Sequence, residues 1–493
     1  MSDLRPGDRL TPLDAAFYHL ERAGQLLHVG GVYTADGPLD HERLVDDIAG
    51  RLHLIPRYTQ RVVPVPFTLA HPTWEAATDF DIRRHLRRHT LRPPGDQAQL
   101  AALAGRLFAR PLDRDHPLWE LHQIDGIDGR RSAIFAKVHH CMIDGVSGVQ
   151  LMEIMFDVSP NPPPRPPAPP LADPPPVPTP LGQAARALWD GLQDLGVRAR
   201  GLVDVLRRPQ DALAVLRSNV GSLQHLVRVF SQPVPATPYN GHVSTLRRVA
   251  WATLPLHEVK SVKNRLGGTV NDVILTIISA ALRRDFERRE LDPDGLELRA
   301  MCPVNVRRAE EHLQLGNRVS MMFAPLPIGI YDPLERLRRV RAIMARVKAS
   351  GESGHVSRLL DLVDLVPAPV QVPLANLQVG WTPVNTVCTN VPGPPVSLYV
   401  QGRRLDVMAP LVPLAQGVGL AFAILSYADA ITLAVTSDPA LVGDVDTLAT
   451  DILDAHAELC GLAGVERGRE RHSVLPERKR RQQRVLQIGP RAS

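Results

Sequence analysis

Two adjacent histidines followed by a carboxylate are the residues in this sequence best suited to chemistry. They lie in the run His139-His140-Cys141-Met142-Ile143-Asp144-Gly145. A neutral imidazole, with an unperturbed pKa near about 6.5, accepts protons at physiological pH. His140 is therefore a candidate general base for a hydroxyl group, a role that typically raises a rate by roughly 10² to 10⁴. Packing alone rarely requires two imidazoles, a carboxylate and a glycine at this spacing.

The same residues also allow purely structural roles. Asp144 suits the N-cap of a following helix, Gly145 suits a turn, and His139 could be a satisfied core histidine. A metal site is disfavoured because neighbouring side chains on an extended segment point in opposite directions. Cys141 as a nucleophile lacks any sign of a lowered thiol pKa. The pattern alone leaves catalysis and structure open.

The elements around the run place it in a loop. Residues 132–138 are mostly apolar, as in a buried strand, and residues 146–158 have helical spacing. The motif therefore joins a strand to a helix, and such loops are where α/β folds expose functional side chains.

The length of 493 residues predicts two domains, since single cores rarely grow beyond roughly 250 to 300 residues. Proline dominates residues 160–180, which we interpret as a linker, and residues 181–230 have the pattern of a basic amphipathic helical segment. That segment either packs on the domains or lies on lipid. The expected parts are an N-terminal domain (1–159), a connection (160–245), a C-terminal domain (246–465) and a basic, disordered tail (466–493).

Both halves show mixed helix and strand patterns, which predicts an α/β fold. In the N-terminal half we expect a strand at 28–33 and helices at 40–51 and 96–109. In the C-terminal half we expect strands at 249–254, 298–306 and 319–326, a hairpin of 420–427 with 431–436, and helices at 272–289 and 444–462.

The composition indicates the cellular compartment in which the protein is expected. The four cysteines form no CxxC or Cys/His ligand spacing, which argues against disulfides and zinc and favours a reducing cytoplasm. No run reaches about 18 apolar residues and the N-terminus lacks a signal-like apolar core, so no membrane span or secretion is expected. Residues 466–493 carry nine Arg/Lys and three Glu, hence +6, a charge that suits anionic lipid or nucleic acid, or simply a solvated chain end.

The motif and its neighbours resemble a known family. His139 to Gly145 match the HHxxxDG signature of the superfamily that includes chloramphenicol acetyltransferases, condensation domains and wax ester synthase/diacylglycerol acyltransferases. The last family is the most similar, over roughly residues 10 to 462, although Leu27 and Asp429 depart from its usual residues. The matching blocks are Pro12-Leu13-Asp14, His28-Val29-Gly30-Gly31, Pro111-Leu112-Asp113, Pro117-Leu118-Trp119-Glu120, Asn271-Asp272-Val273, Pro303-Val304-Asn305-Val306-Arg307, Gly316-Asn317, Asn390-Val391-Pro392-Gly393-Pro394 and Ser426-Tyr427.

The resemblance implies two chloramphenicol-acetyltransferase-like sandwich domains with a channel between them and His140 at its middle. It implies that His139 orients its neighbour and that Asp144 shapes the loop, with Arg307 as a candidate partner. Three residues, Gly145, Asn271 and Asp272, would bind substrate in the channel. Asn271 can also be interpreted as the N-cap of a helix that begins at Asp272.

The implied substrates are a long-chain acyl-CoA and either diacylglycerol or a fatty alcohol, with no metal or redox cofactor. Such substrates imply peripheral binding to the inner membrane face or to lipid droplets, and no nucleic-acid partner. Two alternatives stay open: a condensation-type enzyme that uses carrier-bound acyl groups, and a non-catalytic lipid-droplet coat protein of the same fold.

Overall fold

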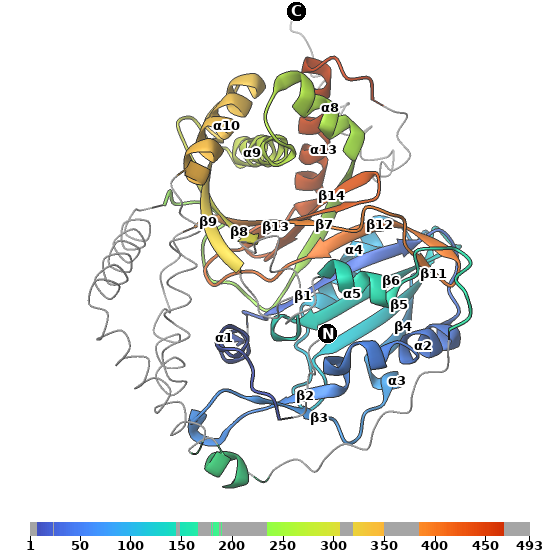
Figure 1. Ribbon diagram of the computed structural model, residues 1–493. Coiled ribbons are helices and arrows are strands. Elements are labelled where there is room, and N and C mark those ends of the chain that lie inside the picture. Colours follow the sequence, from blue (N-terminus) through green and yellow to red (C-terminus); the bar gives the residue numbers. More distant parts are fainter. Residues whose placement is uncertain are drawn as a thin grey trace, which may run out of the picture.

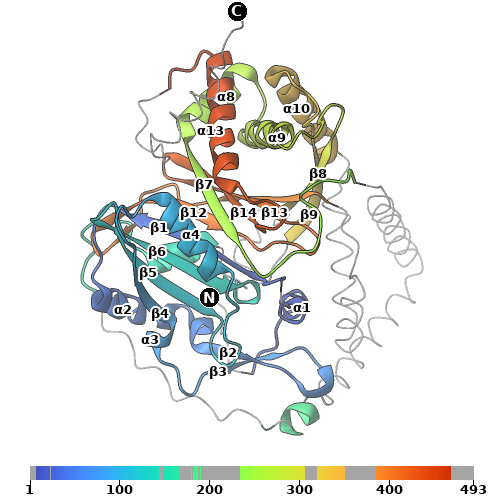
Figure 2. The same cartoon turned by 180° about the vertical axis from the view of Figure 1, so that it is seen from behind.

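The computed structural model shows an α/β protein of two halves, each built on a mixed sheet with helices against it (Figures 1 and 2). The predicted fold class is therefore confirmed. Asp144, Gly145, Arg307, most of the connection 160–245 and almost all of the tail lie outside the described residues. The structure describes residues 7–22, 24–143, 148–165, 179, 181–186, 189, 234–305, 319–349 and 384–467.

The N-terminal sheet has the strand order β11-β12-β1-β6-β5-β4. The β4–β5 pair is parallel and the other pairs are antiparallel. The strand β6, predicted from its apolar run, lies in the middle of the sheet between β1 and β5, so its end is held on both sides. The strands are β1 (His28–Ala35), β4 (Leu86–Thr90), β5 (Trp119–Ile127), β6 (Arg131–His139), β11 (Tyr399–Val400) and β12 (Arg403–Leu411), with a separate hairpin of β2 (Gln60–Val63) and β3 (Thr73–Ala76).

The C-terminal sheet has the order β7-β14-β13-β10-β8-β9. In it β10 runs parallel to both β13 and β8. The predicted hairpin is confirmed, because β13 and β14 pair in antiparallel register from Leu420↔Ser437 to Tyr427↔Ala430. The strands are β7 (Arg248–Pro255), β8 (Leu298–Asn305), β9 (Val319–Leu326), β10 (Thr386–Pro392), β13 (Leu420–Tyr427) and β14 (Ala430–Ser437).

A segment from the C-terminal half of the sequence belongs to the N-terminal sheet. Strand β12 comes from the C-terminal half of the sequence but pairs with β1 in the N-terminal sheet, from Gly30↔Leu411 to Ala35↔Leu405. One buried cluster contains Phe135 of β6 together with Trp251 of β7 and Ala434 of β14. The sheets therefore share a hydrophobic core, which fixes how the halves sit against each other.

The predicted helices that lie within the described residues are confirmed, with ends shifted by at most three residues. The predicted helical segment 181–230 lies almost entirely outside the described residues. Figure 1 shows α8, α9, α10 and α13 on the face of the C-terminal sheet that points away from the N-terminal half. Helix α9 lies between α10 and α13 and is apolar on most of its faces, as a central core helix should be. The helices are α1 (Pro12–Leu20), α2 (His41–Ala49), α3 (Ile82–His85), α4 (Gln97–Phe108), α5 (Gly148–Met155), α8 (Leu256–Leu266), α9 (Val270–Arg288), α10 (Pro333–Ala349) and α13 (Val445–Leu462), and the 3-10 turns are η1 (Leu52–Leu54), η2 (Pro56–Thr59), η3 (Pro66–Thr68) and η4 (His140–Met142).

Within the described part of the chain, no single helix has the length and apolar composition of a membrane span. The pair α8 and α9 reaches that composition only when taken together, with a bend of 98° between the two helices.

Candidate active site

The histidine motif begins where β6 ends. His139 is the last residue of the strand and pairs with His28 of β1, while His140 begins the 3-10 turn η4. The backbone N–H of His140 donates to the carbonyl of Leu27, at 2.8 Å. The motif is thus anchored to the segment that leads into β1, and the predicted position of the motif after a strand is confirmed.

The His140 ring lies against α1. It stacks on Phe17 with 4.1 Å between ring centroids and 29° between ring planes. Its Nδ1 is buried and has no hydrogen-bond partner among the described residues. Burial, with a smaller contribution from the nearby His139, lowers the pKa of His140 to about 4. The imidazole is therefore uncharged at neutral pH and able to accept a proton.

His139 is held by a second set of contacts on the inner side of the motif. Its Nδ1 accepts from the backbone N–H of Cys141 at 3.2 Å and lies 3.0 Å from the Cys141 sulfur. Its Nε2 lies 3.3 Å from Oε2 of Glu21. Burial raises the pKa of the Cys141 thiol well above its usual value, and the side chain is fully buried, which argues against the nucleophile alternative.

Glu21 connects the motif to its surroundings. It accepts from the backbone N–H of Leu27 at 2.9 Å and from Arg114 at 3.3 Å. Burial by itself would raise the pKa of Glu21, but His139, Leu27 and Arg114 together lower it to about 2, so the carboxylate is charged. The sequence analysis did not identify Glu21 as a site residue. It is the C-cap residue of α1, where a negative charge opposes the helix dipole, and that unfavourable position is a signal that could have indicated it.

A buried ion pair supports the strand that carries the motif. Lys137, two residues before His139 on β6, is fully buried, and its Nζ lies 2.9 Å from Oε2 of Glu120 on β5. Nζ also donates to the carbonyls of Leu107 and Arg110 at 3.3 and 3.1 Å. Despite burial, which would raise it, hydrogen bonding and charge from His122 and Lys137 lower the pKa of Glu120 to about 2.

The candidate residues of the C-terminal half lie at the start of α9. The prediction that Asn271 caps this helix is wrong, because Thr269 is the N-cap and forms a capping box with Asp272. The carboxylate of Asp272, buried at the third helical position, fixes the helix start two residues earlier than the pattern indicated. Asn271 instead accepts from the side-chain amide of Asn390, at 3.2 Å.

In the structure, the candidate site residues from the family-matching segments lie in two separate groups. One group joins His139 and His140 with α1, and the other joins the start of α9 with the end of β10. Among the described residues, neither Asn271 nor Asp272 forms a hydrogen bond or ion pair with either histidine. Tyr427, from another block, has a structural role: its hydroxyl donates to the carbonyl of Leu405 at 2.9 Å, which ties β13 to β12.

Two family profiles match the chain. The profile described as the wax ester synthase/diacylglycerol acyltransferase catalytic domain covers residues 10–274. The WS/DGAT C-terminal domain covers residues 315–459. A curated protein of Mycobacterium tuberculosis (strain CDC 1551 / Oshkosh), named "Probable diacyglycerol O-acyltransferase", is 32% identical over 482 residues, which are 95% of this chain and 99% of that protein.

Solved structures share the fold. A wax ester synthase/diacylglycerol acyltransferase from Marinobacter aquaeolei VT8 has a TM-score of 0.67 at 24% identity, covering 93% of this chain and 100% of that chain. The first condensation domain of the calcium-dependent antibiotic synthetase has a TM-score of 0.57 at 16% identity, covering 92% and 97%. With both profiles matched in order and a relative aligned over nearly its whole length, the chain belongs to the wax ester synthase/diacylglycerol acyltransferase family.

Proposed function

We propose that this acyltransferase moves a long-chain acyl group from coenzyme A to the hydroxyl of diacylglycerol, of a fatty alcohol, or of both, with His140 as general base. The observation that carries the proposal is an uncharged imidazole at the end of β6, held by its backbone to Leu27 and by its ring to Phe17. Family membership supports the reaction class, and the name of the mycobacterial relative favours diacylglycerol as acceptor.

In this mechanism the His140 ring accepts the hydroxyl proton as the alcohol oxygen attacks the thioester carbonyl. The tetrahedral intermediate collapses with loss of the coenzyme A thiolate. The thiolate then accepts the proton from the imidazolium, which restores the neutral ring. An ester and free coenzyme A are the products. These steps use no metal ion, no redox cofactor and no covalent acyl-enzyme.

The remaining residues position this ring or the substrates. His139, fixed by Glu21 and Cys141, holds the turn that carries His140 in one conformation. By resemblance to the family, we assign Asp144 and Arg307 to the shape of the loop. We likewise assign Gly145, Asn271 and Asp272 to substrate binding.

Replacing Glu21 with Gln removes a buried charge from the network that holds His139. Because small misplacement of a catalytic group costs about a hundredfold in rate, we expect kcat to fall roughly tenfold to a hundredfold. The KM for acyl-CoA should stay unchanged, since Glu21 supports the base and not the donor. Steady-state kinetics check this. Glu42→Gln, which removes a carboxylate exposed on α2, is the control, and an unchanged kcat in Glu21→Gln would refute the positioning role.

The function itself is tested by product analysis. Purified protein is incubated with palmitoyl-CoA and either dioleoylglycerol or hexadecanol, coenzyme A release is followed, and the lipids are separated. We expect triacylglycerol, wax ester or both, in amounts equal to the coenzyme A released. A condensation-type enzyme would release no coenzyme A from these substrates, and a coat protein would form neither product, so either result would contradict the proposal.

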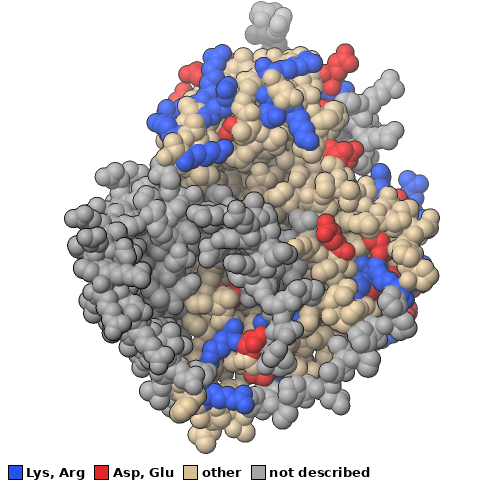
Figure 3. Space-filling model, viewed as in Figure 1, with Lys and Arg blue, Asp and Glu red and all other residues tan. Residues whose placement is uncertain are grey.

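We further propose that the protein binds membrane or lipid-droplet surfaces peripherally, because its acceptors are dissolved in lipid. Figure 3 shows Lys and Arg side chains gathered on the C-terminal half, where α10 lies. The acidic residue of α10 is Glu335, in its first turn. Elsewhere on the chain, Leu181 and Trp189 are exposed apolar side chains. The exposed cations of α10 are Arg338, Arg339, Arg341, Arg346 and Lys348.

Neutralising part of this surface should weaken binding to anionic vesicles. Each cation near such a surface contributes about 1 kcal/mol, or roughly fivefold in partitioning. Arg338→Gln combined with Arg346→Gln should therefore reduce co-sedimentation with phosphatidylserine-containing vesicles by roughly 25-fold. Arg43→Gln on α2 is the matched control, and equal binding by all three proteins would rule out α10 as the contact surface.

A further inference from the structure

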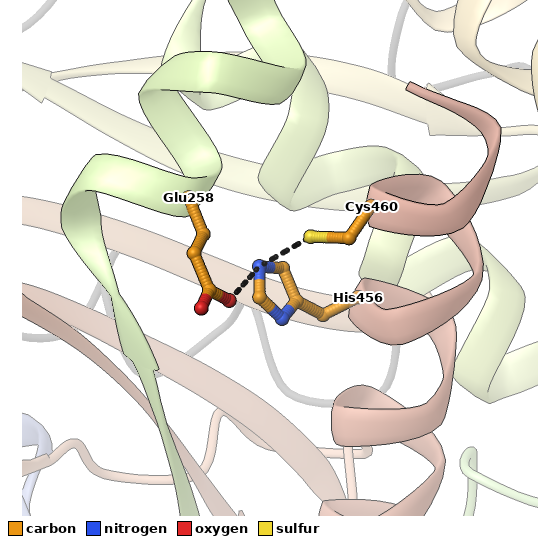
Figure 4. Close-up of side chains that lie close together, drawn as sticks. All are labelled: Glu258, His456 and Cys460. Atoms are coloured by element: carbon orange, nitrogen blue, oxygen red, sulfur yellow. Dashed lines mark hydrogen bonds and ion pairs between the residues drawn. The ribbon is translucent and has the colours of Figure 1, made fainter. Parts of the chain in front are cut away.

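A separate group of buried side chains lies in the helix layer of the C-terminal half. Glu258 is in the first turn of α8, and His456 and Cys460 are one turn apart on α13. Their relative exposures are 2%, 1% and 0%. Figure 4 shows the three side chains pointing toward one another across the space between the two helices. These residues have no part in the proposed acyl transfer.

The contacts of this cluster converge on a single nitrogen. His456 Nε2 lies 3.4 Å from the sulfur of Cys460 and 3.7 Å from Oε2 of Glu258. One oxygen, one nitrogen and one sulfur all lie within 4.8 Å of one another. The 3.7 Å separation is too long for a hydrogen bond. The oxygen and the sulfur instead both lie near the same nitrogen.

Their spacing is close to that of ligands around zinc. Zinc–sulfur bonds are about 2.3 Å and zinc–nitrogen or zinc–oxygen bonds about 2.0 to 2.2 Å, and tetrahedral angles then put ligand atoms about 3.3 to 3.6 Å apart. The contact between His456 Nε2 and the Cys460 sulfur, at 3.4 Å, falls in that range, and the contact between His456 Nε2 and Glu258, at 3.7 Å, lies slightly above it. The third edge, between Glu258 and Cys460, is at most 4.8 Å. The Glu258 side chain would have to move toward the other two for all three to bind one ion.

A second buried group of Glu, His and Cys side chains in this chain lacks such convergence on one nitrogen. Glu21, His139 and Cys141 are also buried and in contact, but there the carboxylate approaches Nε2 while the sulfur approaches Nδ1. These nitrogens lie on different edges of the ring, so that group cannot share one ion through the imidazole.

We propose that Glu258, His456 and Cys460 bind one zinc ion that links α8 to α13. A sulfur, nitrogen and oxygen set favours zinc over magnesium or calcium, which prefer oxygen ligands. On binding, the Cys460 thiol releases one proton and becomes a thiolate. The double positive charge of the ion is then balanced by the thiolate and the carboxylate, so the buried site is neutral overall. A water molecule or the second carboxylate oxygen completes the coordination.

The sequence analysis predicted no metal site, and the geometry explains why the cluster escaped it. His456 and Cys460 supply only two ligands at a spacing of one helical turn, and Glu258 comes from the other end of the C-terminal half. Only the packing of α8 on α13 brings the third ligand to the other two. The ion would be structural, holding two outer helices together, and separate from the chemistry at His140.

The test is the metal content of the full chain, purified without an affinity tag from zinc-supplemented cells and dialysed against metal-free buffer. We expect about one zinc per chain by elemental mass spectrometry. In Cys460→Ser and in Glu258→Gln the content should fall at least tenfold. Cys302→Ser, which removes another buried cysteine, should keep its zinc. Zinc retained equally in all variants, or absent from the native protein, would overturn the proposal.

A second measurement works on the native protein alone and does not depend on variants that fold. Cobalt(II) added to zinc-depleted protein should give a thiolate-to-cobalt absorption band at one equivalent, and one equivalent of zinc should abolish it. Zinc should also raise the thermal unfolding midpoint, whereas magnesium should not. No cobalt–thiolate band would contradict the site. Neither readout depends on acyl transfer, so failure of the proposed function would be seen separately.

Discussion

Replacing His140 with Ala should reduce kcat by roughly 10² to 10⁴ while the protein stays folded. In the proposed mechanism the variant loses the group that removes the hydroxyl proton as the oxygen attacks. An unassisted alcohol is a weak nucleophile toward a thioester, so attack becomes the slow step. The KM for acyl-CoA should change little, because binding of the donor does not require the proton to move.

The measurement is a single-turnover assay of coenzyme A release, which isolates the chemical step from product release. His140→Asn is made in parallel, because it fills much of the space against Phe17 and limits loss of packing. His53→Ala removes an exposed histidine of η1 and is the matched control. If both His140 variants melt like the native protein and keep more than a third of its rate, His140 is not the base.

The second large effect is on stability. Glu120→Ala leaves the ammonium of Lys137 buried without its carboxylate partner. Breaking one side of a buried ion pair typically costs about 3 to 5 kcal/mol in the free energy of unfolding. We therefore expect Glu120→Ala to be among the most destabilising single changes in the N-terminal half. Combined with Lys137→Met, it should recover most of that loss, since the uncompensated charge is then gone.

The exposed pair of Glu42 with Arg83, at 2.6 Å, is the matched control. Both of its side chains are more than half exposed, and Glu42→Ala should leave the free energy of unfolding nearly unchanged, because solvent screens the pair. Urea unfolding followed by tryptophan fluorescence compares the four proteins. Equal destabilisation by Glu120→Ala and Glu42→Ala would contradict the role assigned to the buried pair, as would a double variant no more stable than Glu120→Ala.

Local patterns in the sequence were enough to predict about half of the described helices and strands and the position of the histidine motif. The apolar run before His139 predicted β6, and the end of that strand is where the structure places the two histidines. Helix starts marked by a capping aspartate were also predicted well, as at Asp40, Asp96 and Asp444. In each of these cases the information is contained in a few neighbouring residues.

Features that depend on long-range packing were not predictable in this way. Strand β12 has the composition of an ordinary strand, and nothing in it indicates pairing with β1 rather than with its own half. Glu21 reads as a surface acid at a helix end, yet it contacts His139 and Arg114, both far away in the sequence. The cap of α9 was misplaced because Asp272 was interpreted as the first residue of the helix rather than as one side of a capping box.

A pH study of this protein must allow for its stability. Burial lowers the pKa of His28 to about 3, as well as that of His140 to about 4, whereas both would titrate near about 6.5 in the unfolded chain. Below that pH the unfolded state binds more protons than the folded state. The stability contributed by these neutral rings is therefore full above about pH 6.5 and is lost progressively as the pH falls.

The most direct test of the central claim is a pH-jump single-turnover assay, in which protein loaded at neutral pH is mixed into buffers down to about pH 3.5, before it can unfold. With a His140 pKa of about 4, the native rate should be nearly constant from pH 7 to 5 and should then fall tenfold per pH unit below the pKa. A solvent-exposed imidazole would instead lose about 25-fold between pH 7 and 5. His140→Ala should be slow throughout and lack the acid fall. An acid fall with the same midpoint in both proteins would contradict the assignment of His140 as the base.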